Sequence, residues 1–234
     1  MLHYIYYICF ILSFLRILNA IIVESENDII NELLKSSGIV TLSINTKIDI
    51  IKEIKINNSI QKLYIIGNSL NSAKLNLKYP FYFESSIEEI EIKNININGT
   101  LFFMKKNKII TLDTINLNGY IDSDFDNNSS NSIEITNLIY KPNGESVEYC
   151  INLSGNININ KSYFYGDNSC QNRLLRYNGF NKYILNLRES YFNGNYKCPF
   201  LSIKDTLNAN IETSYFEKGY GSKYVDGGYI KKII

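Results

Sequence analysis

A short apolar frame recurs along most of the chain and limits the folds that it can adopt. In each copy, an aliphatic residue is followed five positions later by a large apolar residue and usually seven positions later by glycine. The starting positions step by 20, 23, 24, 28 and 24 residues, which is typical of a repeat with turns of variable length. The six copies start at Ile92, Leu112, Ile135, Ile159, Leu187 and Ile211.

The offset of five between the two apolar anchors indicates how one repeat is shaped. Side chains alternate along a strand, so residues five apart cannot point to the same face of a straight strand, and a bend must separate them. One repeat also holds too little apolar surface to fold alone, so each must stack on its neighbours. The frame therefore predicts an all-β, right-handed parallel β-helix solenoid. A leucine-rich horseshoe would need a constant repeat length, and a β-sandwich would not explain the frame.

The two ends of the predicted solenoid differ. Residues 21–38 contain a capping-type start at Ser25 to Asp28, apolar residues at helical spacing from Ile29 to Leu34, and Gly38 as a stop, so we expect one short N-terminal capping helix. Residues 39–234 would form the β-helix repeats. The C-terminal residues Tyr229–Ile234 start another strand with no cap after it, and an uncovered edge favours self-association or indicates a truncated β-helix.

Residues 1–20 predict a secretory signal peptide. An apolar run from Ile5 to Leu15 is followed by the small residue Ala20 at the expected cleavage point, although His3 replaces the usual basic residue and Arg16 ends the run. The alternative is a membrane anchor, but the run is shorter than the roughly 20 apolar residues that a spanning helix needs. We expect a secreted or cell-surface glycoprotein without a membrane span in the mature chain. N-glycosylation acceptor triplets start at Asn57, Asn98, Asn127, Asn128, Asn152 and Asn160.

Charge and cysteine content exclude several partners. The chain has 24 basic and 23 acidic residues, and this balance lacks the clustered basic excess that nucleic acids or anionic membranes require. Cys9 lies in the signal, so Cys150, Cys170 and Cys198 can form at most one internal disulfide, whose pairing stays open. The absence of a C-x-x-C pair makes a thiolate zinc site unexpected.

Particular segments resemble a known family. After the capping helix come Gly38-Ile39-Val40-Thr41-Leu42 and Leu63-Tyr64-Ile65-Ile66-Gly67-Asn68, and later rungs such as Ile159 to Gly166 follow the same core pattern. Together they resemble the pectin lyase-like right-handed parallel β-helix superfamily over roughly residues 24 to 230. This resemblance implies the fold and says little about function, because the family's active-site motifs are not matched.

The residues available for catalysis or metal binding are few. His3 is the single histidine and leaves with the signal, so a Ser-His or Cys-His nucleophile and a His-ligated metal are excluded. Asp122, Asp124 and Asp126 alternate as Ca²⁺ ligands can, although an EF-hand signature is absent and a solvated loop is the alternative. We therefore expect no obligatory cofactor, with Ca²⁺ as the single candidate.

Three tyrosines occupy equivalent places in successive rungs. Tyr163, Tyr191 and Tyr215 each precede a repeated phenylalanine, so they should point outward where the phenylalanine points inward, about 4.8 Å apart from rung to rung. Such a column of phenols could bind sugar rings, or it could simply stabilise neighbouring strands by aromatic pairing.

The leading functional hypothesis is therefore a secreted, non-catalytic surface, structural or adhesive module that binds cell-wall or host polysaccharide weakly through the tyrosine column. The alternative is a polysaccharide lyase or glycoside hydrolase that uses Asp122, Asp124 and Asp126 with an arginine such as Arg188. The alternative requires these groups to share one groove.

Overall fold

The computed structural model describes residues 20–220 and 229–231, and the predicted signal peptide lies outside them except for Ala20. One helix and twenty strands are present in this part of the chain. Their bounds are β1 Ile21–Val23, α2 Glu26–Lys35, β2 Gly38–Ile44, β3 Lys47–Ile50, β4 Ile60–Gly67, β5 Lys74–Leu77, β6 Phe81–Phe83, β7 Glu89–Phe103, β8 Ile109–Ser123, β9 Ser132–Thr136, β10 Ile139–Lys141, β11 Val147–Ser154, β12 Asn156–Asn160, β13 Tyr163–Tyr165, β14 Cys170–Asn178, β15 Ile184–Arg188, β16 Tyr191–Asn193, β17 Leu201–Lys204, β18 Asn208–Glu212, β19 Tyr215–Glu217 and β20 Tyr229–Lys231.

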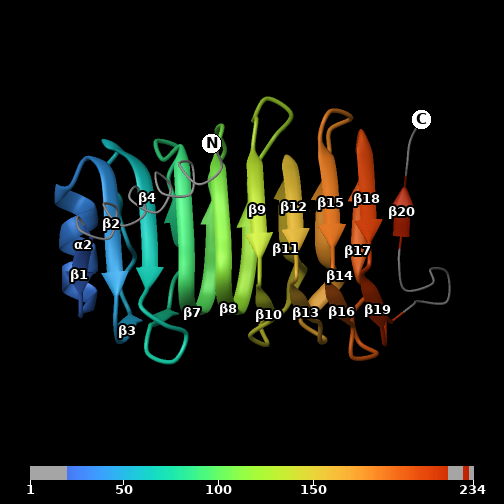
Figure 1. The fold of residues 1–234 in the computed structure, drawn as a ribbon, viewed down its shortest axis with the longest axis horizontal. Helices are drawn as coiled ribbons and strands as arrows, with labels where there is room; N and C mark the ends of the chain where they lie inside the picture. The colour runs from blue at the N-terminus through green and yellow to red at the C-terminus, as the bar shows by residue number, and fades with distance from the viewer. Residues whose placement is uncertain (1–19, 221–228, 232–234) are drawn as a thin grey trace, which may run out of the picture.

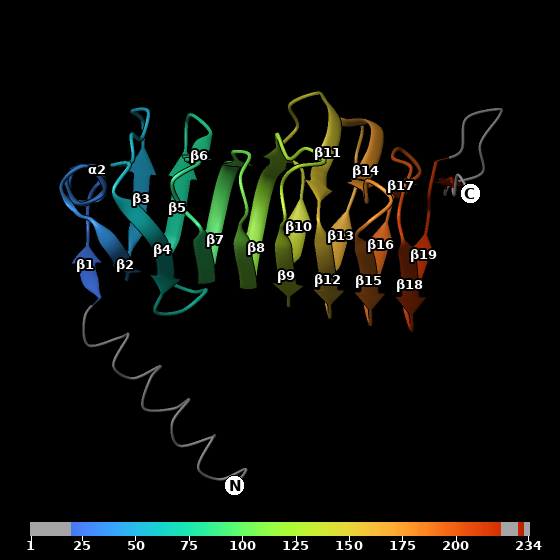
Figure 2. The same cartoon turned by 90° about the horizontal axis from the view of Figure 1, so that it is seen from above.

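The strands form a parallel β-solenoid of about eight turns, which confirms the predicted fold class (Figures 1 and 2). The strands pair in parallel with their equivalents on adjacent turns, and these pairings fall into three separate sets, which are the three faces of the wall. Face A contains β1, β2, β4, the first parts of β7 and β8, β9, β12, β15 and β18. Face B contains β3, β5, the middle parts of β7 and β8, β10, β13, β16 and β19. Face C contains β6, the last parts of β7 and β8, β11, β14, β17 and β20.

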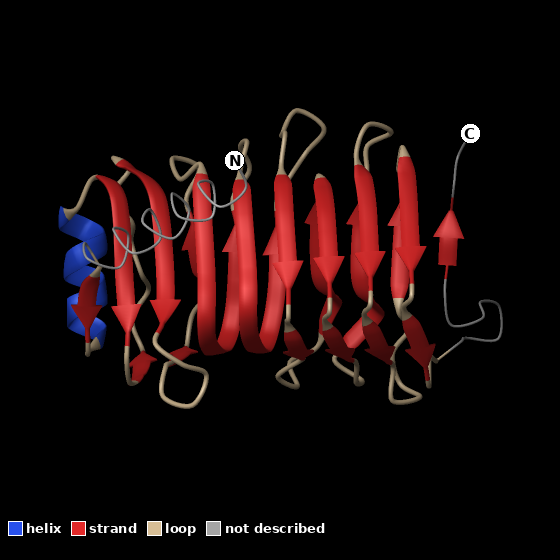
Figure 3. Ribbon diagram, in the orientation of Figure 1, coloured by secondary structure: helices blue, strands red, loops and turns tan. Residues whose placement is uncertain are grey.

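The predicted capping helix α2 closes the N-terminal end of the solenoid (Figure 3). Ser25 is its N-cap and forms a capping box with Asp28, and the buried face carries Ile29 and Leu33. Glu26 accepts hydrogen bonds from two backbone N–H groups of the segment after β3, each at 2.7 Å. The helix thus provides an acceptor for two backbone donors at the open end of the solenoid. The sequence did not predict β1, which pairs with β2 before the helix begins.

Inward-facing residues stack into columns along the solenoid axis. On face B, the large residues of the repeated frame form one such column, and its rings contact one another from rung to rung. The ring centroids of Phe164 and Phe192 lie 4.4 Å apart, and those of Phe192 and Phe216 lie 4.9 Å apart. Phe164 and Phe192 are fully buried, whereas Phe216, on the last described rung of this face, is 37% exposed.

The predicted bend lies between faces A and B, and it has the same conformation in six successive rungs. The residue two positions after each face A anchor has a positive φ, between 46° and 55°. These residues are Asn94, Thr114, Asn137, Lys161, Glu189 and Thr213. The left-handed region normally costs a non-glycine residue about 1–2 kcal/mol, so the stacking on either side must hold the corner in place.

The glycines of the repeat allow close approach between rungs. A β-carbon added to Gly99 would lie 2.6 Å from the β-carbon of Leu77 on the preceding rung, and its φ of 129° is unfavourable for other residues. A larger residue there would push the two rungs apart.

A disulfide joins two adjacent rungs of face C. Cys150 of β11 and Cys170 of β14 are bonded, with their α-carbons 5.2 Å apart. Cys198 is a buried free thiol, and burial raises its pKa to about 12. The structure thus resolves the pairing that the cysteine count left open.

The last described strand, β20, pairs with β17 of face C, as the apolar pattern after residue 228 suggested. Self-association through this end stays a prediction.

Residue 189 offers a direct test of the corner conformation. We expect Glu189→Asn to raise the free energy of unfolding by about 0.5–1 kcal/mol, because Asn tolerates the left-handed region better than Glu. Glu189→Val, the matched control, should lower it by about 1–3 kcal/mol, because a β-branched residue is strained there. Urea unfolding followed by circular dichroism measures both, and equal stability of the two variants would contradict the corner argument.

The cysteine assignment predicts a distinct labelling pattern. In the folded protein at neutral pH, an alkylating reagent should leave Cys198 unmodified, because the thiol is buried and protonated. Unfolding without reductant should expose Cys198, while peptide mapping finds Cys150 and Cys170 still linked. Replacing both linked cysteines by alanine should lower stability by about 3 kcal/mol. Alkylation of Cys198 in the folded protein would contradict its assignment as a buried thiol.

Candidate functional site

The predicted tyrosine column lies on the outside of face B. Tyr163, Tyr191 and Tyr215 are paired in register on β13, β16 and β19, one residue out of phase with the buried phenylalanines. Tyr163 is 48% exposed and Tyr215 is 68% exposed, while Tyr191 is half-buried between them. Ile139 of β10, which is 41% exposed, extends the same column by one rung. The three tyrosines are called the phenol column below, and Ile139 is an apolar neighbour at its end.

The rings of Tyr163 and Tyr191 lie farther apart than the rung spacing of about 4.8 Å that the sequence analysis predicted. The centroids of Tyr163 and Tyr191 lie 6.1 Å apart, and their planes make an angle of 48°. The hydroxyl of Tyr191 donates a hydrogen bond to Glu217 Oε1 on the next rung, which orients the Tyr191 ring along the axis. Tyr163 and Tyr191 are therefore tilted toward one another rather than stacked flat.

A polar column runs beside the phenol column on the same face. It consists of Lys141, Tyr165, Asn193 and Glu217. Asn193 Nδ2 donates to the Tyr191 hydroxyl at 3.0 Å and to Glu217 Oε1 at 3.1 Å. The hydrogen bond from Tyr191, together with Lys218, keeps the pKa of Glu217 below its usual value. Face B thus presents ring faces beside an amide and an ionised carboxylate.

The other half of face B carries amide side chains in place of phenols. Asn98 Nδ2 donates to Asn76 Oδ1 at 2.7 Å, and Asn116 Nδ2 donates to Asn96 Oδ1 at 2.8 Å. Two shallow clefts, whose linings include Lys74, lie among these residues. The polar surface of face B therefore continues toward the N-terminal end of the solenoid.

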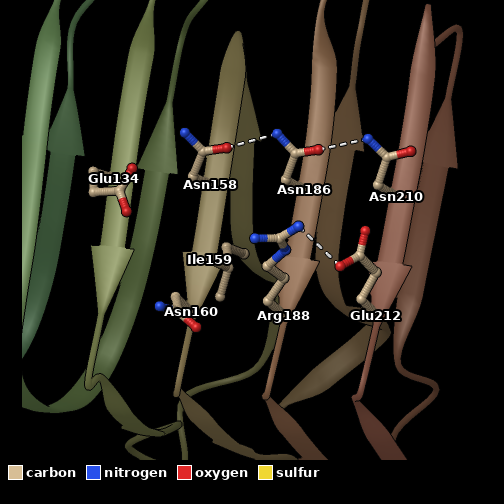
Figure 4. A pocket seen from close by; sticks show the side chains of 8 residues that line it. All are labelled: Glu134, Asn158, Ile159, Asn160, Asn186, Arg188, Asn210 and Glu212. Carbon is tan, nitrogen blue, oxygen red and sulfur yellow. Dashed lines mark hydrogen bonds and ion pairs between the residues drawn. The ribbon is translucent and has the colours of Figure 1, made fainter.

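Face A holds a second polar groove, which the sequence analysis did not identify (Figure 4). Asn158, Asn186 and Asn210 form a ladder in which the amide nitrogens of Asn186 and Asn210 each donate to the amide oxygen of the preceding rung at 2.7 Å. Below the ladder in Figure 4, Arg188 forms a 2.9 Å ion pair with Glu212, and both side chains are more than half exposed. Glu134 lies at the far side of the groove.

The amide ladder could have been found from the repeat itself. Each of its three residues immediately precedes the aliphatic anchor that starts a rung, at Ile159, Leu187 and Ile211. Aligning the rungs by these anchors places the three amides in one outward column. Each hydrogen bond of the amide ladder uses one amide N–H and one acceptor site of an amide oxygen. The remaining N–H groups and acceptor sites of the three amides are available to solvent or a ligand.

The predicted acidic group does not form a single cluster. Asp122 points outward from β8 on face C, where Asn152 Nδ2 donates to it at 2.8 Å. Asp126 lies in the following loop and accepts hydrogen bonds from the backbone of Asn128 and Ser129. In the described part of the chain, no group of three or more His, Cys, Asp or Glu side chains is arranged to hold a metal ion. The calcium prediction therefore has no coordination geometry in its favour.

The structure also separates Asp122 from Arg188, its predicted partner. Arg188 belongs to face A, whereas Asp122 belongs to face C, so the two side chains do not share a groove. Arg173 and Arg176 of β14 lie on the same face as Asp122, and Arg176 is the one that contacts the partner of Asp122. The Nη1 of Arg176 donates to Asn152 Oδ1 at 3.4 Å, and the Arg176 guanidinium group lies 4.9 Å from the centroid of the Tyr149 ring.

A buried lysine lies at the corner that leads from face C to face A. Lys108 is 1% exposed, and its Nζ donates to the carbonyl oxygens of Glu84 at 2.8 Å and Ile87 at 2.6 Å. Burial, followed by the nearby charge of Lys106, lowers the pKa of Lys108 to about 8. Lys108 therefore ties together the backbone of adjacent rungs beneath a surface cleft.

Comparison with known proteins assigns no relative to this chain. No family model matches it, and neither a curated protein nor a solved structure shows significant similarity. The described residues contain no helix that is long and apolar enough to cross a membrane.

The lowered pKa of Lys108 predicts an unusual dependence of stability on pH. Between pH 8 and pH 10.5, the unfolded chain keeps a proton on Lys108 that the folded protein has released, so stability should rise with pH. The Lys108→Met variant lacks this titration. The free energy of unfolding of the native protein, measured relative to this variant, should therefore increase by on the order of 3 kcal/mol over this pH range. Urea titrations of both proteins at several pH values measure the difference, and a constant difference would contradict the assignment.

Proposed function

We propose that this chain is a secreted or cell-surface, non-catalytic module that binds polysaccharide through the phenol column of face B. The observation that carries the proposal is the exposed aromatic column with hydrogen-bonding groups directly beside it. Sugar rings have apolar faces that pack on aromatic rings and hydroxyl groups that bind amides and carboxylates. Tyr191, Asn193 and Glu217 supply both kinds of contact within two rungs.

The repetition of the site suits a polymer better than a small molecule. Successive rungs repeat about every 4.8 Å along the axis, so equivalent contacts recur in a straight line. Each contact is weak by itself, and several in a row would provide a useful affinity through multivalency. A structural or adhesive role at a surface follows from this kind of binding.

The separation of Asp122 from Arg188 supports a binding function over the lyase or hydrolase alternative. Both of these reactions need the acid and its partner on one substrate-binding surface. A screen for new reducing ends or unsaturated products, with and without Ca²⁺, tests the alternative. Release of such products from any polysaccharide would favour it.

Replacing the rings of the phenol column tests the proposal. We expect binding to insoluble polysaccharides, followed by pull-down, to weaken at least tenfold when Tyr163, Tyr191 and Tyr215 are all changed to alanine, because each ring contributes about 0.5–1.5 kcal/mol. Changing the same residues to phenylalanine should retain most of the binding if the ring faces carry it.

The amide ladder of face A provides the matched control. Asn158, Asn186 and Asn210 changed together to alanine alter an equally repetitive polar surface on another face, so polysaccharide binding should stay within about twofold, a change of only about 0.4 kcal/mol. Loss of binding in this variant, with the tyrosine variants unaffected, would move the site to face A and contradict the proposal. Thermal unfolding of all variants shows whether the fold is retained.

A further inference from the structure

Two tyrosines of the phenol column, Tyr163 and Tyr191, also form a contact cluster with Tyr165. Tyr191 of β16 lies beside Tyr163 and Tyr165 of β13, with ring centroids 6.1 Å and 6.2 Å apart. All three rings lie on the outer surface of the solenoid, where soluble oxidants can reach them. Phenols are the side chains that couple to one another after one-electron oxidation, so the proximity has a chemical consequence.

Tyr191 is the member of the cluster that is best prepared to lose an electron. Oxidation of a phenol also releases its proton, and Tyr191 already donates a hydrogen bond to the carboxylate of Glu217. Lys218 Nζ lies 3.4 Å from the same oxygen, and the pKa of Glu217 is lowered, so the carboxylate is ionised at neutral pH. The hydrogen bond to Glu217 raises the pKa of Tyr191, so the phenol itself stays protonated until it is oxidised.

We propose that Tyr191 is an oxidation site whose radical couples to Tyr163, which forms a dityrosine bridge between β13 and β16. The oxidant is of the peroxidase class, with hydrogen peroxide as co-substrate. Each phenol loses one electron and its hydroxyl proton, and the proton of Tyr191 passes to Glu217. The two rings then form a carbon–carbon bond at positions ortho to the hydroxyls, and the ortho hydrogens return to the oxygens. Two electrons and two protons reduce one peroxide to two waters.

The neighbouring charges favour Tyr163 over Tyr165 as the coupling partner. Lys141 Nζ lies 5.2 Å from the centroid of the Tyr165 ring, and a cation over a ring opposes the removal of an electron from it. No cation is recorded over the ring of Tyr163 among the described residues, and this side chain is 48% exposed. The Tyr163 ring is also less steeply inclined to Tyr191, at 48° against 62° for Tyr165.

The bridge would join two rungs of the surface that we propose to hold polysaccharide. It depends on the proposed extracellular location only for a supply of oxidant, and it does not depend on carbohydrate binding. Failure to bind polysaccharide therefore leaves the bridge unaffected, and failure to form the bridge leaves the binding measurement unaffected.

The test uses the purified full-length chain treated with peroxidase and hydrogen peroxide, and then reduced and digested with trypsin. The cluster divides between two tryptic peptides, residues 162–173 and 189–197. We expect these two peptides to be joined with the loss of two hydrogen atoms, and fragment ions should place the link at Tyr163 and Tyr191. The yield should be independent of protein concentration, because the link is intramolecular.

Variants separate this reaction from general oxidation of exposed tyrosines. Tyr191→Phe should abolish the cross-linked peptide, and Glu217→Gln should slow its formation several-fold, because a neutral amide is a poor proton acceptor. Tyr79→Phe is the matched control, since Tyr79 is 46% exposed and lies near Lys78, and it should leave the yield unchanged. The proposal is overturned if no link forms while added free tyrosine is oxidised, if the link appears only between molecules, or if the control lowers the yield equally.

Discussion

Parallel backbone pairing between successive turns is the interaction on which the rest of the structure depends. Strands of each face pair with their equivalents one turn away, and the register is maintained for most of the solenoid. Because parallel pairing in register places equivalent side chains above one another, any residue that recurs at one position of the repeat becomes a column. The phenylalanine stack, the amide ladder and the phenol column all arise in this way.

The corner between faces A and B shows that this pairing can hold residues in an unfavourable backbone conformation. Six successive rungs hold a non-glycine residue at positive φ, and they include the β-branched Thr114 and Thr213. None of these residues favours that conformation as glycine would. The stacked strands on both sides of the corner supply the stabilisation, and serines such as Ser162 and Ser190 satisfy nearby backbone groups. The strain is thus shared among six successive rungs.

The three faces carry different chemistry although they belong to one repeat. Face A presents amides and an Arg–Glu ion pair, face B presents phenols beside a carboxylate, and face C links Asp122 through Asn152 to Arg176. Residues that are far apart in the sequence become neighbours on one face, whereas residues close in the sequence point to different faces. Tyr191 and Arg188 are three positions apart, yet the corner at Glu189 places them on separate surfaces.

The solenoid, the capping helix and the outward direction of the tyrosines could be predicted from the sequence, because they follow from local patterns: the offset of five, the capping box and strand alternation. The contacts that depend on angles and on turn lengths between rungs became visible only in the folded structure. The intervals between rungs vary, so the sequence could not show that Cys150 meets Cys170 or that Asp122 meets Asn152. It also could not give the tilt of the tyrosine rings, because that tilt depends on Glu217, which lies one rung away.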